Sequence, residues 1–130
     1  MKAYGIMWLV LCSFSSAQAL ECDNAMTQLE MNQCASEAYA QADAALKQAY
    51  VDVQHRSQAP QRLLLEKAQQ HWLAYRDANC KFQSYNAQEG SVGPMVLALC
   101  LTAETQARAS FLKQMLDCPE GDVSCPLLPK

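Results

Sequence analysis

The chain has 130 residues, of which 51% are hydrophobic, and its formal net charge is −3 at pH 7. This length provides for one domain with one hydrophobic core. Its acidic balance argues against binding to nucleic acid or to an anionic membrane, because like charges repel. The same balance is compatible with a basic protein partner.

The first nineteen residues are typical of a secretory signal peptide. Lys2 supplies a positive start, residues 6–12 supply a short apolar core, and Ala17-Gln18-Ala19 forms a small-x-small cleavage site. The apolar run is too short to span a bilayer, so we expect no membrane insertion of the mature chain. The sequence therefore predicts a soluble, exported protein, periplasmic or secreted, that begins at Leu20.

The cysteine content indicates disulfides rather than catalysis. Removal of the signal peptide takes Cys12 with it and leaves six of the seven cysteines, an even number typical of a small exported protein. Paired thiols provide no nucleophile, and the two histidines lack the spacing of a metal site. The chain contains no phosphate-binding loop, dinucleotide motif or nucleophile elbow. We expect no enzyme activity, no cofactor and no metal.

The first predicted helix starts at a capping signal. Thr27 followed by Glu30 fits a capping box, in which each side chain binds the other residue's backbone N–H. Pro60 ends the helix, because proline disfavours helical geometry in the residue before it. The apolar stripe expected to face the core has a period close to 3.6: Met31, Ala35, Ala38, Tyr39, Ala42, Leu46, Ala49, Tyr50 and Val53.

Two further helices are predicted, from about Gln61 to about Asn86 and from about Met95 to Leu116, with a loop over residues 90–94 between them. The core side expected for the second is Leu64, Ala68, Trp72, Tyr75, Asn79, Phe82 and Tyr85. For the third it is Leu99, Thr102, Gln106, Ala109, Leu112 and Leu116. Without any strand pattern, these elements predict an all-α fold, a small antiparallel three-helix bundle over residues 20–117 stapled by disulfides. Residues 118–130 form a turn-rich C-terminal tail.

Trp72, Arg76 and Cys80 recur every four residues, so they share one inward face of the second helix. We expect structural roles for them, because an unpaired buried charge costs several kcal/mol. In an antiparallel pair, residues equally far from the turn lie opposite each other. Asp43 and Arg76 are 17 and 16 residues from Pro60, which predicts a charge-assisted pair between them.

The same symmetry about Gly90 predicts two contacts between the second and third helices. Cys80 and Cys100 are each ten residues from Gly90, which predicts a disulfide. Trp72 and Arg108 are each eighteen residues away, which predicts a guanidinium stacked on an indole.

The remaining cysteines complete one set of pairs. Cys22 reaches Cys34 if the N-terminal segment folds back along the first helix, and Cys118 and Cys125 then close the tail. Six cysteines allow fifteen pairings, so other sets remain open at the level of sequence.

Two surfaces are candidate binding elements. The first is the loop from Asn86 to Pro94, with Glu89, Gly90 and Ser91 at its tip; the alternative is a plain interhelical connection. The second is the acidic N-terminal region, which either steers a basic partner or is only a solvated face. Residues 20–56 contain two basic residues, Lys47 and Arg56, and six acidic ones: Glu21, Asp23, Glu30, Glu37, Asp43 and Asp52.

The motifs together resemble the LprI-type lysozyme-inhibitor family, from about Cys22 to Met115. The resemblance is carried by the following residues: Cys22, Thr27-Gln28, Glu30-Met31-Asn32, Cys34, Asp43, Leu46, Tyr50, Gln70, Trp72, Tyr75-Arg76-Asp77, Cys80, Gly90-Ser91, Cys100, Arg108 and Leu112. It implies that the cysteines at 22, 34, 80 and 100 belong to the family pattern, whereas those of the tail are an addition.

The resemblance implies an exported helical protein that inhibits lysozyme. Lysozymes of the common animal type are basic, so an acidic partner with a small polar loop at residues 89–91 fits their cleft. The rival interpretation is a structural or interaction protein of the cell envelope that does not inhibit lysozyme.

Overall fold

The computed structural model describes residues 22–119 and 121–127, so the signal peptide predicted over residues 1–19 lies outside the described residues. In the described part the order is η1 (Cys22–Asn24), α1 (Gln28–Arg56), α2 (Ala59–Gln83), η2 (Tyr85–Ala87) and α3 (Gly93–Leu116), with no strand. Three disulfides accompany these helices. The predicted class, an all-α three-helix bundle stapled by disulfides, is confirmed.

The start of α1 has the predicted capping box. The Thr27 hydroxyl accepts a hydrogen bond from the Glu30 N–H at 3.2 Å. The Glu30 carboxylate accepts bonds from the N–H groups of Thr27 and Met26, both at 2.9 Å. These bonds hold the pKa of the Glu30 carboxyl below its ordinary value, and the bond from the Thr27 N–H has the largest effect. The first turn of α1 therefore has its exposed N–H groups satisfied.

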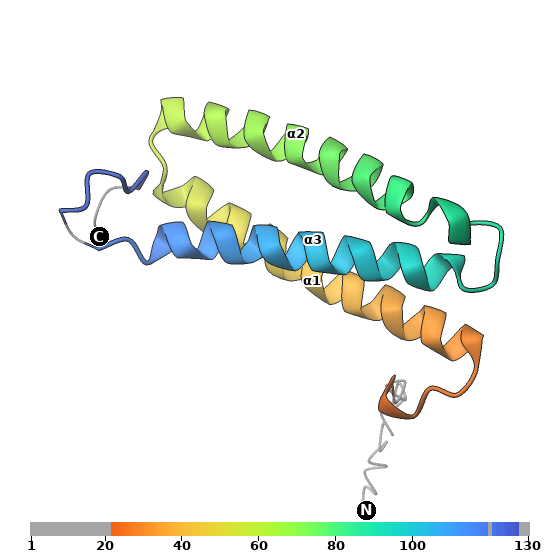
Figure 1. Ribbon diagram of the computed structural model, residues 1–130. Helices are drawn as coiled ribbons and strands as arrows, with labels where there is room; N and C mark the ends of the chain where they lie inside the picture. Colours follow the sequence, from red (N-terminus) through yellow and green to blue (C-terminus); the bar gives the residue numbers. More distant parts are fainter. Residues whose placement is uncertain (1–21, 120, 128–130) are drawn as a thin grey trace, which may run out of the picture.

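The three helices do not contribute equally to the bundle. α1 and α3 pack against each other over the most extensive interface, whereas α2 packs chiefly on α3 (Figure 1). The core between α1 and α3 contains small and branched side chains that let the helices approach closely: Leu46, Ala49, Val53, Ala109 and Leu112. Trp72 and Leu65 of α2 pack against this core at its edge.

The stripes predicted for α1 and α3 are largely those that the structure buries. In α1 five of the predicted positions are buried, and only Ala38 among the rest is exposed. In α3 Ala109 and Leu112 are buried as predicted, but Leu99 and Gln106 face solvent. The polar Thr105 is fully buried there instead.

The core side predicted for α2 is wrong at five of its seven positions, whereas Trp72 and Asn79 are partly buried. Leu64, Tyr75, Phe82 and Tyr85 are 68%, 57%, 80% and 65% exposed. The buried residues of α2 are Arg76 and Cys80, on the neighbouring face. Because Cys80 must face α3 to form its disulfide, the helix is rotated so that Tyr75 and Phe82 point outward.

Helices α2 and α3 each begin two residues earlier than predicted, at Ala59 and Gly93. Pro60 lies in the first turn of α2, where a missing N–H has no cost. Pro94 lies in the first turn of α3, which starts at the buried Gly93. A side chain at Gly93 would place its Cβ 2.6 Å from the Ala87 carbonyl oxygen. Only glycine therefore allows the loop to close this tightly against the helix.

The tail folds back over the end of the bundle that holds the α1–α2 turn. The Cys118–Cys125 disulfide closes it, and the Asp122 carboxylate accepts bonds from the N–H and hydroxyl of Ser124 at 2.9 and 2.6 Å. Gln61 of α2 donates a hydrogen bond to the Pro126 carbonyl. Leu127 is buried with the α1–α3 core. The tail thus contributes Leu127 to the hydrophobic core.

Candidate functional site

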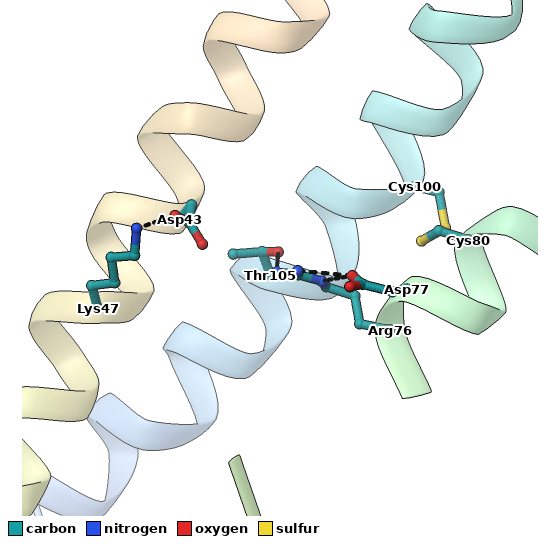
Figure 2. Close-up of polar contacts among 7 residues, drawn as sticks. All are labelled: Asp43, Lys47, Arg76, Asp77, Cys80, Cys100 and Thr105. Carbon is teal, nitrogen blue, oxygen red and sulfur yellow. Dashed lines mark hydrogen bonds and ion pairs between the residues drawn. A yellow bond between two sulfur atoms is a disulfide. The ribbon is translucent and has the colours of Figure 1, made fainter. Parts of the chain in front are cut away.

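The three predicted disulfides are present. Cys22–Cys34 ties the N-terminal turn η1 to α1, and Cys118–Cys125 closes the tail. Cys80–Cys100 joins α2 to α3 across a sequence separation of 20 residues (Figure 2). All six cysteines of the described chain are therefore paired, and none of them can act as a nucleophile.

Arg76 extends from α2 to α3, as Figure 2 shows. Its Nη1 donates to the hydroxyl of the buried Thr105 at 3.3 Å. Its Nε and Nη2 contact the Asp77 carboxylate at 2.9 and 2.8 Å. The predicted Asp43–Arg76 pair is wrong: Asp43 binds Lys47 on its own helix at 2.7 Å, and this hydrogen bond raises the pKa of Lys47. The reason is that α2 packs chiefly on α3, and the α1 side chain that Arg76 meets is Tyr39.

Aromatic rings surround both guanidinium groups of this region. Arg76 lies over the rings of Trp72 and Tyr39, at 5.2 and 5.5 Å from their centroids. Arg108 lies 5.7 Å from the Trp72 ring, so the predicted stacking is present, and 5.4 Å from the Phe111 ring. Burial lowers the pKa of Arg108. By cation–π attraction the Arg108–Trp72 contact joins α3 to α2, and the Arg76–Tyr39 contact joins α2 to α1.

The buried polar side-chain groups of the described chain are all paired. Within residues 22–119 and 121–127, no buried side-chain nitrogen or oxygen lacks a hydrogen-bond partner. The same residues contain no group of three His, Cys, Asp or Glu side chains that could hold a metal ion. None of their helices is both long and apolar enough to cross a membrane.

The loop between α2 and α3 is held rigidly at one end of the bundle. Consecutive turns run through it: Gly90 N–H donates to the Ala87 carbonyl and Gly93 N–H to the Gly90 carbonyl, both at 3.0 Å. The side chain of Asn32 on α1 donates to the Ser91 carbonyl at 2.9 Å. Glu89, Gly90 and Ser91, the candidate binding residues, are all exposed. We call these three residues the loop tip.

Some of the supporting residues were missed from the sequence. Asn32 fixes the loop although 59 residues separate it from Ser91. Gln69 accepts a bond from the Arg108 guanidinium at 3.1 Å, and Thr105 accepts one from Arg76. A single polar residue on a helix has no local pattern that indicates its distant partner.

Residues 21–112 match the protein family described as Lysozyme inhibitor LprI. The chain belongs to the LprI lysozyme-inhibitor family. It is also 33% identical over 130 residues to a Rhizobium meliloti protein described as uncharacterized, with 87% of this chain and 94% of that protein covered. No solved structure matches the chain.

The LprI match includes α1, α2, the loop tip and most of α3, and it ends before the tail. The disulfides Cys22–Cys34 and Cys80–Cys100 lie inside the matched LprI region. The tail disulfide lies outside it. The family description is that of an inhibitor and not of an enzyme.

Proposed function

We propose that this LprI protein is an exported lysozyme inhibitor that occludes the lysozyme cleft with its loop tip, Glu89, Gly90 and Ser91. The observation that carries the proposal is the exposure of these residues on a loop with successive internal hydrogen bonds, anchored to α1 by Asn32. A loop fixed before binding loses little conformational entropy on association. The family description supports lysozyme as the partner.

The charge at this end of the bundle supports a basic partner. The segments that meet there, η1, the first turns of α1 and the loop, contain four acids: Asp23, Glu30, Glu37 and Glu89. The last turn of α2 contributes Lys81 as the nearby base. A negative field around the loop tip attracts a basic protein and raises its association rate.

The disulfides support export. Three disulfides in one small domain form and persist in an oxidising compartment and not in the cytosol. The periplasm or the extracellular medium is where such a protein meets a lysozyme that attacks the cell wall. The predicted signal peptide agrees with this location.

The test is inhibition of several basic lysozymes by the disulfide-intact protein. Glu89→Gln removes the charge at the loop tip and Ser91→Ala removes the hydroxyl; we expect the double variant to inhibit at least about tenfold more weakly. Glu66→Gln, the same change at an exposed position of α2 toward the other end of the bundle, is the matched control and should inhibit normally. Inhibition that is unchanged in the double variant overturns the loop assignment. Absence of inhibition for every lysozyme overturns the function.

The second candidate is an envelope interaction protein without lysozyme inhibition, and the exposed apolar residues of α2 favour it. Binding to immobilised lysozyme as a function of salt separates the two. Association steered by charge weakens as the ionic strength rises, because salt screens exposed charges over about 10 Å at 0.1 M. Binding that is absent at low salt favours the envelope protein.

A further inference from the structure

A largely apolar stripe with one histidine runs along an exposed face of α2. Leu64, Ala68, His71, Tyr75, Ala78 and Phe82 are all exposed, and Tyr85 of η2 continues the series. Figure 1 shows α2 as the outer helix next to α3. This stripe includes most of the residues that the sequence predicts to face a core. A helix with a regular apolar face buries that face against something.

The spacing of the stripe identifies the kind of partner. The six α2 positions follow one another at steps of 4, 3, 4, 3 and 4 residues, which is the repeat of a coiled-coil seam. Such a seam is narrower than the face of a helix that lies on a membrane surface. It fits the side chains of a second helix, knob into hole, over about 27 Å of helix length.

We propose that this stripe is a homodimer interface, at which α2 of one chain packs on α2 of a second copy. A twofold dimer uses the same patch on both subunits, so the patch must be compatible with itself. The six positions contain no Asp, Glu, Lys or Arg, so pairing buries no unmatched charge from the seam. Lys67 and Lys81 lie beside the seam and are exposed.

The exposed aromatic rings of the stripe supply about half of the area that a stable dimer buries per partner. Tyr75, Phe82 and Tyr85 are more than half exposed, and together their rings offer about 400 Å² per copy, because a whole aromatic side chain buries about 200 Å². A stable dimer buries about 800 Å² per partner. Leu64 and the neighbouring Leu63, also mostly exposed, add to the apolar part of this area.

Hollows at both ends of the stripe provide room for the side chains of the second copy. One, of about 310 Å³, is lined by Leu64 and Ala68 together with residues of α1, α3 and the tail. The other, of about 410 Å³, is lined by Phe82, Tyr85 and Asn86. Interfaces bury their aromatic and aliphatic anchors in such depressions.

The test is the mass of the disulfide-intact protein in solution, by sedimentation and light scattering from about 1 to about 200 µM, where mass action reveals weak dimers. We expect a concentration-dependent dimer. Tyr75→Glu and Phe82→Glu should each raise the dimer dissociation constant at least about tenfold, because each places a charge in the seam. Leu99→Glu makes a comparable change on α3, at a position 54% exposed, and should leave the dimer intact. Far-ultraviolet circular dichroism confirms that each variant is folded.

Three results overturn the proposal: a monomer at every concentration, a dimer unaffected by both stripe variants, or a dimer lost equally in Leu99→Glu. Vesicles of anionic lipid provide a further arm. A protein that stays monomeric and binds these vesicles through Tyr75 and Phe82 uses the stripe for a membrane and contradicts a homodimer. Lysozyme inhibition is measured separately and does not depend on this result, because the loop tip and the stripe are different surfaces.

Discussion

The guanidinium of Arg76 donates to the hydroxyl of Thr105 across the α2–α3 interface, with 3.3 Å between Nη1 and Oγ1, and both residues are buried. Arg76 is also held by Asp77 of its own helix and by the ring of Trp72. Among residues 22–119 and 121–127, Thr105 is the residue of α3 that forms a hydrogen bond with Arg76. This bond and the Cys80–Cys100 disulfide, one turn away on α2, therefore fix α2 against α3.

Replacing Thr105 with valine tests this bond. Thr105→Val keeps the shape of the side chain but leaves one buried guanidinium N–H without an acceptor, so the free energy of unfolding should fall by about 1–3 kcal/mol. Urea denaturation measures it. Asp43→Asn is the control, because Asp43 pairs with the exposed Lys47 and such surface pairs contribute little to stability. An equal loss in both variants would mean that Asp43 supports Arg76 after all.

The contacts predicted by counting residues from a turn are present only where the two helices that the turn joins pack on each other. Cys80–Cys100 and Trp72–Arg108 join α2 to α3 and are present. Asp43–Arg76 required the backbones of α1 and α2 to lie close together, and α2 lies closer to α3. Counting residues from a turn predicts which positions lie level with each other along the helix axes. It does not predict how a helix is rotated about its axis or which other helix it packs on.

The rotation of α2 is the clearest case. The spacing of Trp72, Arg76 and Cys80 predicts an inward face, and Arg76 and Cys80 are buried. The larger apolar residues of α2 predicted a different face, and the structure exposes it. Hydrophobicity alone selects the more apolar face, whereas a covalent bond to α3 decides which face points inward. Of the candidate site, the sequence located the loop tip, but the Asn32 anchor required coordinates.

Removing disulfides should destabilise the chain in order of loop length. Replacing Cys80 and Cys100 by alanine releases a loop of 20 residues and should lower the free energy of unfolding by about 3 kcal/mol. The same change at Cys118 and Cys125 releases a loop of 7 residues and should cost about 2 kcal/mol. Thermal and urea unfolding of the two double variants gives the comparison. A larger loss for the tail pair would contradict the chain-entropy argument.

The capping box should make stability depend on pH. Hydrogen bonds from Thr27 and Met26 depress the pKa of Glu30 in the folded chain below its ordinary value of 4.5. A carboxyl group whose pKa is lowered by folding stabilises the fold at any pH above its pKa in the unfolded chain. This contribution is lost as the pH falls through its pKa in the folded chain. Glu30→Gln removes the titration, so the variant should be less stable than the parent at pH 7 and the difference should shrink by about pH 3.

Unfolding in urea at the two pH values measures this difference. Glu37→Gln makes the same change at an exposed position of α1 outside the capping box, and it is the matched control. If the Glu30 variant loses no more stability than the Glu37 variant at pH 7, the carboxylate of Glu30 does not stabilise the helix start.

The tail should contribute to stability through one side chain. Leu127 is buried with Val53 and Leu112 although it lies beyond α3, so Leu127→Ala should lower the free energy of unfolding by about 2 kcal/mol. Val123, inside the Cys118–Cys125 loop of the tail, is fully exposed. Val123→Ala should therefore change the free energy of unfolding by less than about 0.5 kcal/mol. Urea denaturation of both variants decides the matter. Equal stability of the Leu127 variant and the parent would show that the core is complete without the tail.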